Sequence, residues 1–503
     1  MTSQFSKVFL SRLATTQLPN NLQVPSATGG GPSQQSRSPV LNHPVTAPFL
    51  SSQKRGLSSY MMRPGPSHKI SRKVNDFQNR IHLPLRSMSN FAKNFYQIHP
   101  VDFVKGDGVK LIDANGKEYY DAHSAYGVTL FGHSLGELYK PVLDKIMANQ
   151  MPMTHGAFPK KDTEIVAKTI AHKTAACLGG APEDWQVYFN NTGAEAVETG
   201  LKFARKWGSE EKKLNDENKL IFGVKGCFHG RALGGTSLFD GKKKNYQDGF
   251  GPLLPGIHHI ELNNLEGLKA LEKKGATTAA IMLEPIQGEG GINVPSAEWI
   301  KELSAICQRQ NILIVADEVQ SGLHRTGPFW ASAHFRHLGF SPDILLSAKA
   351  LGGGLYPVGA VVMKRNIADL LKPGMHGSTF GGNIIAMGAV ARTLALIDTL
   401  HIEKNVSAQS DLLDTLLAEL KKKYPDNVKE ITGAGLWRGI RFDETLSTHR
   451  VAETMLKNGL ITGESGSKVL RFAPALNVSA EELKKMVELL DKSFEEISRP
   501  DFA

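Results

Sequence analysis

The part of this chain around which the rest is organised comprises three stretches of sequence. They are N-I-L-I-V-A-D-E-V-Q-S-G (residues 311–322), P-D-I-L-L-S-A-K-A-L-G-G-G-L-Y-P-V-G-A (342–360) and H-G-S-T-F-G-G-N (376–383). The apolar run Ile312–Ala316 ends at Asp317, and the run Ile344–Leu346 is followed within three residues by Lys349. Because ligands of open α/β sheets bind at the carboxyl ends of strands, this carboxylate and this amine form a candidate catalytic pair. The glycines after Lys349 leave room for a ligand to approach the backbone.

The region from about residue 187 alternates between short apolar runs and helical patterns. The clearest helix is expected from Thr192 to Trp207. The strand-like runs are Val187–Phe189, Leu220–Val224, Ala279–Leu283, Ile312–Ala316, Ile344–Leu346 and Val358–Val362. Such alternation predicts the α/β class, with a mostly parallel sheet covered by helices.

The last hundred or so residues have a different pattern. Helical stretches at Gln409–Lys423 and Ala480–Ile497 flank a strand pair near Leu436–Phe442 and Val469–Phe472. This pattern predicts a smaller α+β domain. We expect an N-terminal hairpin over Val109–Tyr120 to complete it, since Asn115-Gly116 between two strand-like runs is a strong hairpin signal.

We therefore divide the chain into a leader and two domains. The predicted segments are a leader at 1–90, the N-terminal part of the small domain at 91–145, the large domain at 146–395 and the C-terminal small domain at 396–503.

The composition is that of an ordinary globular protein. The chain has 503 residues, of which 41% are hydrophobic and 21% are charged, enough for at least one large core. No apolar run approaches the ~18 residues that span a membrane. The three cysteines, Cys177, Cys227 and Cys307, are too few and too scattered for a disulfide framework or a zinc site, so we predict a reducing compartment and no metal.

The net charge of +10 comes from the leader. Residues 1–75 contain nine Lys or Arg and no Asp or Glu, which leaves 50 basic against 49 acidic side chains in the rest of the chain. A basic nucleic-acid-binding surface is therefore not indicated. An acid-free, Ser-rich leader is typical of mitochondrial transit peptides. We expect import into the mitochondrial matrix; a plastid leader or a cytoplasmic tail is the alternative.

A phosphate site is expected where the predicted strand ending at Phe189 turns into the helix beginning at Thr192. Asn191-Thr192-Gly193-Ala194-Glu195 lies at this turn, and Thr192 and Glu195 have the spacing of a capping box. A helix N-terminus favours a phosphate dianion, and glycine lets it approach the amides. The same turn is common in proteins that bind no phosphate there.

Six motifs in order resemble the class III aminotransferases, which are pyridoxal-phosphate enzymes of fold type I. The motifs are N-T-G-A-E-A (191–196), F-H-G-R (228–231), E-P-I-Q-G-E-G-G (284–291), A-D-E-V-Q-S-G (316–322), A-K-A-L-G-G-G (348–354) and H-G-S-T-F-G-G-N (376–383). The resemblance covers the chain from about Tyr96 to Ile497. It implies a transaminase that takes an amino acid and a 2-oxo acid as substrates, with pyridoxal 5'-phosphate as its cofactor and a homodimer as its assembly.

The resemblance also implies roles for single residues. Lys349 would bind the cofactor's aldehyde carbon as an aldimine and then carry a proton, and Asp317 would pair with the ring nitrogen. The cofactor-binding residues would be Thr192, Gly193, Ala194, Phe228, Asp317, Gln320, Lys349, Ser378 and, from the neighbouring subunit, Thr379. The substrate-binding residues would be Tyr126, Arg231, Glu289 and Arg471.

Within the class, the motifs most resemble the ornithine aminotransferase branch. Tyr126 in D-A-H-S-A-Y-G-V matches the tyrosine that contacts the α-amino group of the substrate in that branch. Two features differ from it: Pro159 stands where a second tyrosine is typical, and A-K-A-L-G-G-G is closer to the acetylornithine branch. We therefore expect an ornithine δ-aminotransferase, with N-acetylornithine or 4-aminobutyrate as alternative donors. A further alternative is a protein of this fold that binds the cofactor but catalyses no reaction. The presence of Lys349 and Asp317 disfavours this alternative.

Overall fold

The computed structural model describes residues 99, 101–154, 158, 160–240 and 246–499. Except for His99, these residues lie in one compact unit, Val101–Ala503. The predicted leader therefore lies outside the described residues, and so does Pro159. The helices are α3 (Ser124–Gly127), α4 (Gly136–Met147), α5 (Lys161–Leu178), α6 (Gly193–Glu210), α7 (Leu233–Ser237), α8 (Leu265–Lys273), α9 (Ala297–Gln310), α10 (Arg365–Ala368), α11 (Ile384–Thr399), α12 (Ile402–Lys423), α13 (Thr448–Lys457) and α14 (Ala480–Ile497).

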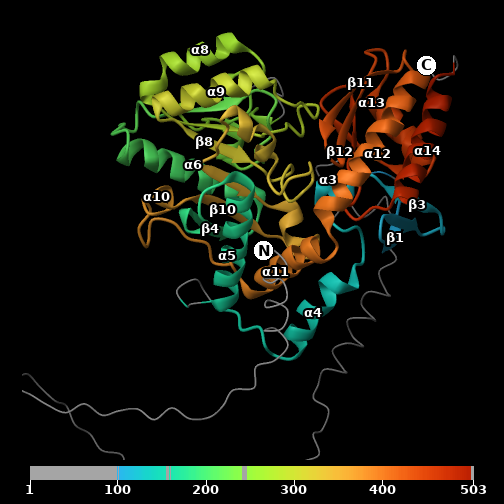
Figure 1. The fold of residues 1–503 in the computed structure, drawn as a ribbon, viewed down its shortest axis with the longest axis horizontal. Helices are drawn as coiled ribbons and strands as arrows, with labels where there is room; N and C mark the ends of the chain where they lie inside the picture. The colour runs from blue at the N-terminus through green and yellow to red at the C-terminus, as the bar shows by residue number, and fades with distance from the viewer. Residues whose placement is uncertain (1–98, 100, 155–157, 159, 241–245, 500–503) are drawn as a thin grey trace, which may run out of the picture. The chain divides into compact units, whose positions relative to one another are not determined.

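A seven-stranded sheet forms the centre of the larger part (Figure 1). Its order is β4 (Trp185–Asn190), β10 (Gly359–Lys364), β9 (Ile344–Ser347), β8 (Leu313–Asp317), β7 (Thr278–Leu283), β5 (Leu220–Val224) and β6 (Ile257–Ile260). Of these strands, β10 alone runs antiparallel to its neighbours β4 and β9. The other pairs are parallel, which confirms the predicted fold class.

Both faces of this sheet are buried under helices. On β7, Ala280 and Met282 pack in a cluster with α6, whereas Ile281 and Leu283 pack in a second cluster with α8 and α9. Strands covered on both faces are apolar at every position. This is why the sequence shows continuous apolar runs rather than alternation.

The chain after α11 builds a second sheet, in the order β11 (Val428–Ala434), β12 (Trp437–Phe442), β15 (Val469–Phe472) and β14 (Gly463–Ser465). The predicted strand pair is present as β12 and β15, which run antiparallel. The predicted helix at 409–423 is longer than expected, because α12 begins at Ile402. Helices α12, α13 and α14 lie beside these strands (Figure 1).

The N-terminal hairpin joins the C-terminal part of the chain. Strands β1 (Phe103–Asp107), β2 (Lys110–Asp113) and β3 (Glu118–Asp121) form a four-stranded sheet with β13 (Leu460–Ile461), which pairs in parallel with β3. At the turn, the Asp113 side chain accepts hydrogen bonds from the backbone N–H groups of Asn115 and Lys117, both at 2.9 Å. These bonds fix the hairpin where Asn115-Gly116 predicts it.

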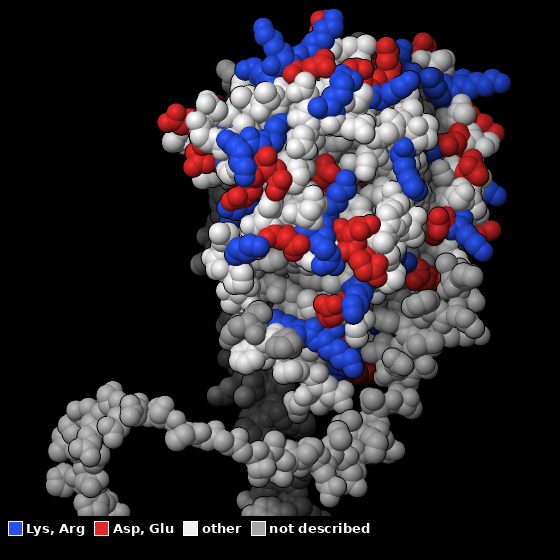
Figure 2. Space-filling model, turned by 60° about the vertical axis from the view of Figure 1, so that its left-hand side comes forward, with Lys and Arg blue, Asp and Glu red and all other residues white. Residues whose placement is uncertain are grey.

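The surface carries both signs of charge. On the face shown in Figure 2, Lys and Arg side chains are interspersed with Asp and Glu. The three cysteines are free thiols. Within the described residues no single helix has the length and apolarity to span a membrane, although α11 and α12, bent by 61°, pass that test as a pair.

Candidate active site

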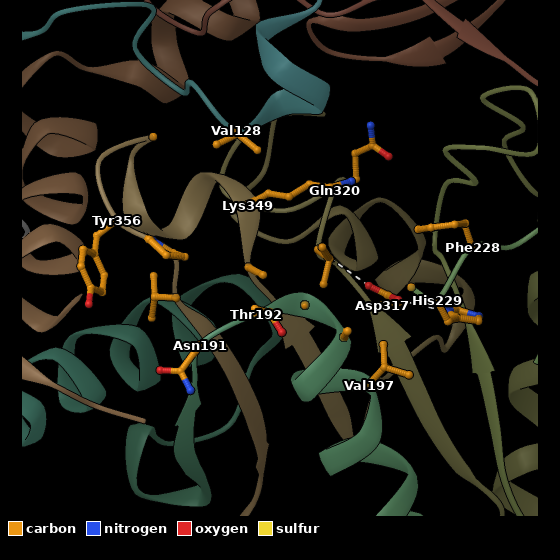
Figure 3. Close-up of a pocket in the computed structure, with 18 of the residues that line it drawn as sticks. Val128, Asn191, Thr192, Val197, Phe228, His229, Asp317, Gln320, Lys349 and Tyr356 are labelled. Atoms are coloured by element: carbon orange, nitrogen blue, oxygen red, sulfur yellow. Dashed lines mark hydrogen bonds and ion pairs between the residues drawn. The ribbon is translucent and has the colours of Figure 1, made fainter. Parts of the chain in front are cut away.

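A cavity of about 430 Å³ lies where several strands of the large sheet end (Figure 3). Asp317 is the last residue of β8, Glu284 follows β7 directly, and Lys349 comes two residues after β9. All three line the cavity, and the Lys349 side chain extends toward Gln320 in Figure 3. The sheet edge thus brings the predicted carboxylate and amine into one cavity.

Asp317 is buried and held in a fixed orientation. Its Oδ2 lies 2.8 Å from Nδ1 of His229, and its Oδ1 accepts a hydrogen bond from the Val319 N–H at 3.1 Å. The His229 side chain is fully buried. These two contacts restrict rotation of the carboxylate, so it presents one edge to the cavity.

Lys349 begins the 3-10 helix η6 (Lys349–Gly352) in a left-handed backbone conformation, with a φ of 43°. A non-glycine residue rarely adopts this conformation, and such strain is frequent at functional sites. Burial, and then the positive charge of Arg471, lowers the pKa of Lys349 to about 8. The amine is therefore close to its titration midpoint in mildly alkaline solution, which suits a nucleophile that also transfers protons.

Glu284 is a second buried carboxyl group in the cavity. Its oxygens accept hydrogen bonds from the backbone N–H groups of Phe228 at 2.8 Å and Gly288 at 3.1 Å. Burial, and then the nearby charge of Asp317, raises the pKa of Glu284 to about 8. At neutral pH the Glu284 carboxyl group is therefore largely protonated.

The N-terminus of α6 forms another wall of the cavity. The Thr192 side chain caps the helix by accepting a hydrogen bond from the Glu195 N–H at 3.2 Å. The predicted capping box is wrong in one detail, because the Glu195 carboxylate accepts from the N–H of Asn191, at 2.7 Å, and not from that of Thr192. The N–H groups of Gly193 and Ala194 lie in the first turn, where helices have no internal acceptor. They are thus suited to bind an anion.

The other predicted cofactor residues differ in position. Phe228 and Gln320 line the cavity, whereas Ser378 is not among the described lining residues and accepts a hydrogen bond from the Asn191 side chain at 3.1 Å. Thr379 is exposed and does not line the cavity in the described part of this single chain.

Three of the predicted substrate residues lie together. The Arg471 side chain is fully buried, and its Nη2 is 2.5 Å from Oε1 of Glu289. Its guanidinium carbon lies 5.2 Å from the centre of the Tyr126 ring. Within the described residues, Nε and Nη1 of Arg471 have no hydrogen-bond acceptor. A buried guanidinium with unused donors is a candidate carboxylate site.

This group is connected to the cavity through Gln320. Its Nε2 donates a hydrogen bond to the carbonyl oxygen of Tyr126 at 3.4 Å. Arg231, in contrast, is exposed, and its guanidinium lies 5.1 Å from the ring centre of Tyr246. The two predicted carboxylate-binding arginines therefore have different surroundings in this chain.

Among the lining residues that sequence reasoning did not assign, three have titratable side chains: His229, Glu284 and Tyr356. Glu284 had a usable signal, because it follows the end of a strand as Asp317 does. His229 and Tyr356 lie inside quoted motifs, F-H-G-R and G-G-G-L-Y-P-V. In neither case does the motif alone show that the side chain faces a cavity.

The sequence matches the family model of the class-III aminotransferases over residues 91–494. The chain belongs to this family. Ornithine aminotransferase 1 of Staphylococcus saprophyticus is 36% identical over 408 residues, which cover 80% of this chain and 97% of that protein. Acetylornithine aminotransferase of Methanocaldococcus jannaschii is 37% identical over 401 residues, which cover 80% and 95%.

Solved structures agree with this assignment. The ornithine aminotransferase of Toxoplasma gondii aligns with a TM-score of 0.74 at 30% identity, covering 87% of this chain and 99% of that one. The acetylornithine aminotransferase of Elizabethkingia anophelis aligns with a TM-score of 0.69 at 31% identity, covering 82% and 97%. The predicted family and fold type I are confirmed. The chain is a pyridoxal-phosphate-dependent transaminase of the ornithine or acetylornithine type.

The cavity fits this cofactor. The α6 N-terminus supplies amides for the phosphate, Phe228 supplies an aromatic face for the ring, and Asp317 supplies a fixed carboxylate for the ring nitrogen. Lys349 supplies the amine for the aldehyde. At Gly193, an added Cβ would lie 3.2 Å from Val319, which also lines the cavity, so there is little space for a side chain at this position.

Proposed function

We propose that this transaminase is an ornithine δ-aminotransferase. It transfers the terminal amino group of L-ornithine to 2-oxoglutarate. The products are glutamate 5-semialdehyde, which cyclises to pyrroline-5-carboxylate, and glutamate. The observation that carries this proposal is the ion pair between the buried Arg471 and the partly buried Glu289, next to the Tyr126 ring.

The ion pair explains how one site can accept two different substrates. While Glu289 neutralises Arg471, the site suits the amine donor, whose reacting end carries no carboxylate. When Glu289 moves away, Arg471 presents its full guanidinium to the second carboxylate of 2-oxoglutarate, for which its Nε and Nη1 are already without acceptors in the described chain. Arg231 is proposed to bind the other carboxylate, and Tyr126 the α-amino group of ornithine.

Lys349 and Asp317 are proposed to carry the chemistry. Pyridoxal phosphate, when bound, withdraws electrons from the substrate carbon that loses its proton. The Lys349 amine, with its pKa lowered to about 8, would take that proton at Nζ and return it at the carbon that was the aldehyde of the cofactor. Asp317, oriented by His229 and the Val319 N–H, holds a proton on the ring nitrogen.

The substitution Tyr126→Ala tests the choice of donor. It removes the proposed contact with the α-amino group, which is free in ornithine and acylated in N-acetylornithine. We expect kcat/KM for ornithine to fall by about 30-fold, or ~2 kcal/mol, the cost of one hydrogen bond to a charged group. Activity with N-acetylornithine should change by less than threefold. Equal losses for both donors would contradict the proposal.

N-acetylornithine is the second candidate donor. The 37% identity to the acetylornithine aminotransferase of M. jannaschii favours it, and so does the sequence A-K-A-L-G-G-G at Lys349. 4-Aminobutyrate is a more distant alternative.

We further propose that the enzyme is a homodimer in the mitochondrial matrix. Thr379, which the family resemblance assigns to the neighbouring subunit's phosphate, is exposed in the single chain. Phe380 beside it is 59% exposed, as an interface residue would be before assembly. The proposed location rests on the acid-free, basic leader at 1–75.

A further inference from the structure

The turn that carries Tyr126 has an unusual backbone. Ser124, Ala125 and Tyr126 have φ values of 49°, 49° and 61°, so three consecutive residues other than glycine adopt the left-handed conformation. Each such residue costs roughly 1–2 kcal/mol. Strain of this kind persists only where surrounding contacts impose it, and it concentrates at functional sites.

Asp121 supplies those contacts. Its Oδ1 accepts hydrogen bonds from the backbone N–H groups of His123 and Ser124, both at 2.9 Å. Its Oδ2 lies 2.9 Å from Nε2 of His133. The buried carboxylate therefore fixes the start of the turn, and the turn directs the side chain of Tyr126.

The Tyr126 ring lies between two other side chains. The His123 ring contacts it edge to face, with centroids 4.3 Å apart and planes at 71°. The Arg471 guanidinium carbon lies 5.2 Å from the Tyr126 ring centre. The position of the His123 ring thus determines where the tyrosine can lie relative to the Arg471–Glu289 pair.

Gly463 in β14 makes room for the His123 ring. A Cβ at position 463 would collide with Cδ2 of His123 and would lie 2.6 Å from its Nε2. That Nε2 is buried and has no hydrogen-bond partner in the described chain. Burial, and then the charge of Arg471, lowers the pKa of His123 to about 4, so the ring is neutral at physiological pH. A neutral ring adds no charge to a site that must discriminate between amines and carboxylates.

We propose that His123, packed against Gly463, is a positioning residue that holds Tyr126 over the Arg471–Glu289 pair and so sets the affinity for the amine donor. This inference rests on the proposed function, since it takes Tyr126 to be a donor contact. His123 is not one of the residues that line the cavity in the described chain, and it acts through the tyrosine.

Three variants test the proposal: His123→Ala, which removes the ring, Gly463→Ala, which displaces it, and the double variant. Steady-state kinetics are measured with ornithine and saturating 2-oxoglutarate. We expect the KM for ornithine to rise about tenfold in each single variant, within the range of coupling between contacting residues, while kcat stays within threefold. The double variant should be no worse than His123→Ala alone, because without the ring the added methyl group has nothing to displace.

The matched controls are His172→Ala, an exposed histidine on α5, and Gly136→Ala, where an added Cβ meets no atom within 4 Å. Both should leave KM unchanged. The proposal is overturned if KM stays within twofold in both single variants, if kcat falls in place of a rise in KM, or if the two effects multiply in the double variant. Gly463→Ala keeps the histidine and carries the test on its own if His123→Ala does not fold.

The proposed function can fail separately. If the wild-type enzyme prefers N-acetylornithine, the choice of donor is wrong. The same variants are then measured with that donor, and an unchanged KM there overturns the role of His123 as well.

Discussion

Lys349 is the residue on which turnover depends in the proposed mechanism. Its strained backbone, its place in the cavity and its lowered pKa all suit an amine that is both nucleophile and proton carrier. Lys349→Ala should lower kcat by about 10⁴-fold, the upper range for general acid–base catalysis. It should also abolish the visible absorbance of the lysine-bound cofactor. Lys372→Ala, which changes an exposed lysine, is the control. Retained turnover in Lys349→Ala would remove the central assumption of the mechanism.

Glu284 provides a test by pH. Folding raises the pKa of the Glu284 carboxyl group from 4.5 to about 8. Between these two pH values Glu284 therefore holds a proton in the folded chain and has released it in the unfolded chain. This contribution to stability is full below pH 4.5 and is lost as the pH rises through 8. Glu284→Gln cannot titrate, so its melting temperature minus that of the wild type should increase from pH 5 to pH 8.

The measurement uses the cofactor-free protein, with Glu266→Gln on the surface as control. A difference in melting temperature that does not change with pH would show that Glu284 has an ordinary pKa.

At the residue scale, the sequence predicted two of the three charged groups near strand ends but missed Glu284, and it also missed His229, which a distant contact places. Asp317 and Lys349 could be predicted because strand ends meet at one edge of a parallel sheet. The contact of His229 with Asp317 joins positions 88 residues apart, and no local pattern indicates it. The positive backbone angles of residues 124–126 were equally inaccessible, since none of the three is a glycine.

The N-terminus of α6 is the element proposed to bind the phosphate group of the cofactor. Thr192→Ala removes the side chain that caps α6, where Thr192 accepts a hydrogen bond from a backbone N–H at 3.2 Å. The matched control is Ser296→Ala, which removes an equivalent capping hydrogen bond of 3.2 Å from α9. Each substitution should cost about 1 kcal/mol of unfolding free energy in urea. Only Thr192→Ala should also weaken cofactor binding, by about fivefold, measured by titration of the cofactor-free protein. Equal cofactor affinity in both variants would argue against a phosphate at this helix.

Elements with strong patterns were predicted well. The runs at β5, β7, β8 and β9 are apolar throughout, because both faces of the sheet are covered. Strand β6 (I-H-H-I) was missed, since two histidines interrupt the apolar pattern at the edge of the sheet. The short β13 was missed because its two residues become a strand only by pairing with β3, some 340 positions earlier in the chain.

For the whole molecule, the proposed dimer predicts a defined mass in solution. Sedimentation of the purified enzyme should give twice the mass of one chain. Phe380→Glu places a charge on an apolar side chain that is 59% exposed in the single chain, and it should shift the equilibrium toward monomer and lower activity in parallel. Leu265→Glu, on an exposed leucine of α8, is the control. A fully active monomer would contradict the role given to Thr379.

The domain boundaries at 90, 145 and 395 stay a prediction. The sheets nevertheless show a physical reason for the chain's organisation, because β1, β2 and β3 from the N-terminal side pair with β13 from the C-terminal side. The predicted substrate-binding residues are also brought together from distant parts of the chain. Tyr126, Glu289 and Arg471 come from three separate regions of the sequence. Their proximity follows from the whole fold and could be predicted only by resemblance to a family.

The most direct test of the central claim is the donor preference of the wild-type enzyme. L-Ornithine, N-acetylornithine and 4-aminobutyrate are each supplied with 2-oxoglutarate, glutamate formation is measured, and Lys349→Ala serves as the blank. We predict that kcat/KM for ornithine exceeds that for the other two donors by about tenfold or more, because the contact with Tyr126 contributes ~2 kcal/mol for ornithine and less for donors without a free α-amino group. A higher kcat/KM for N-acetylornithine would contradict it.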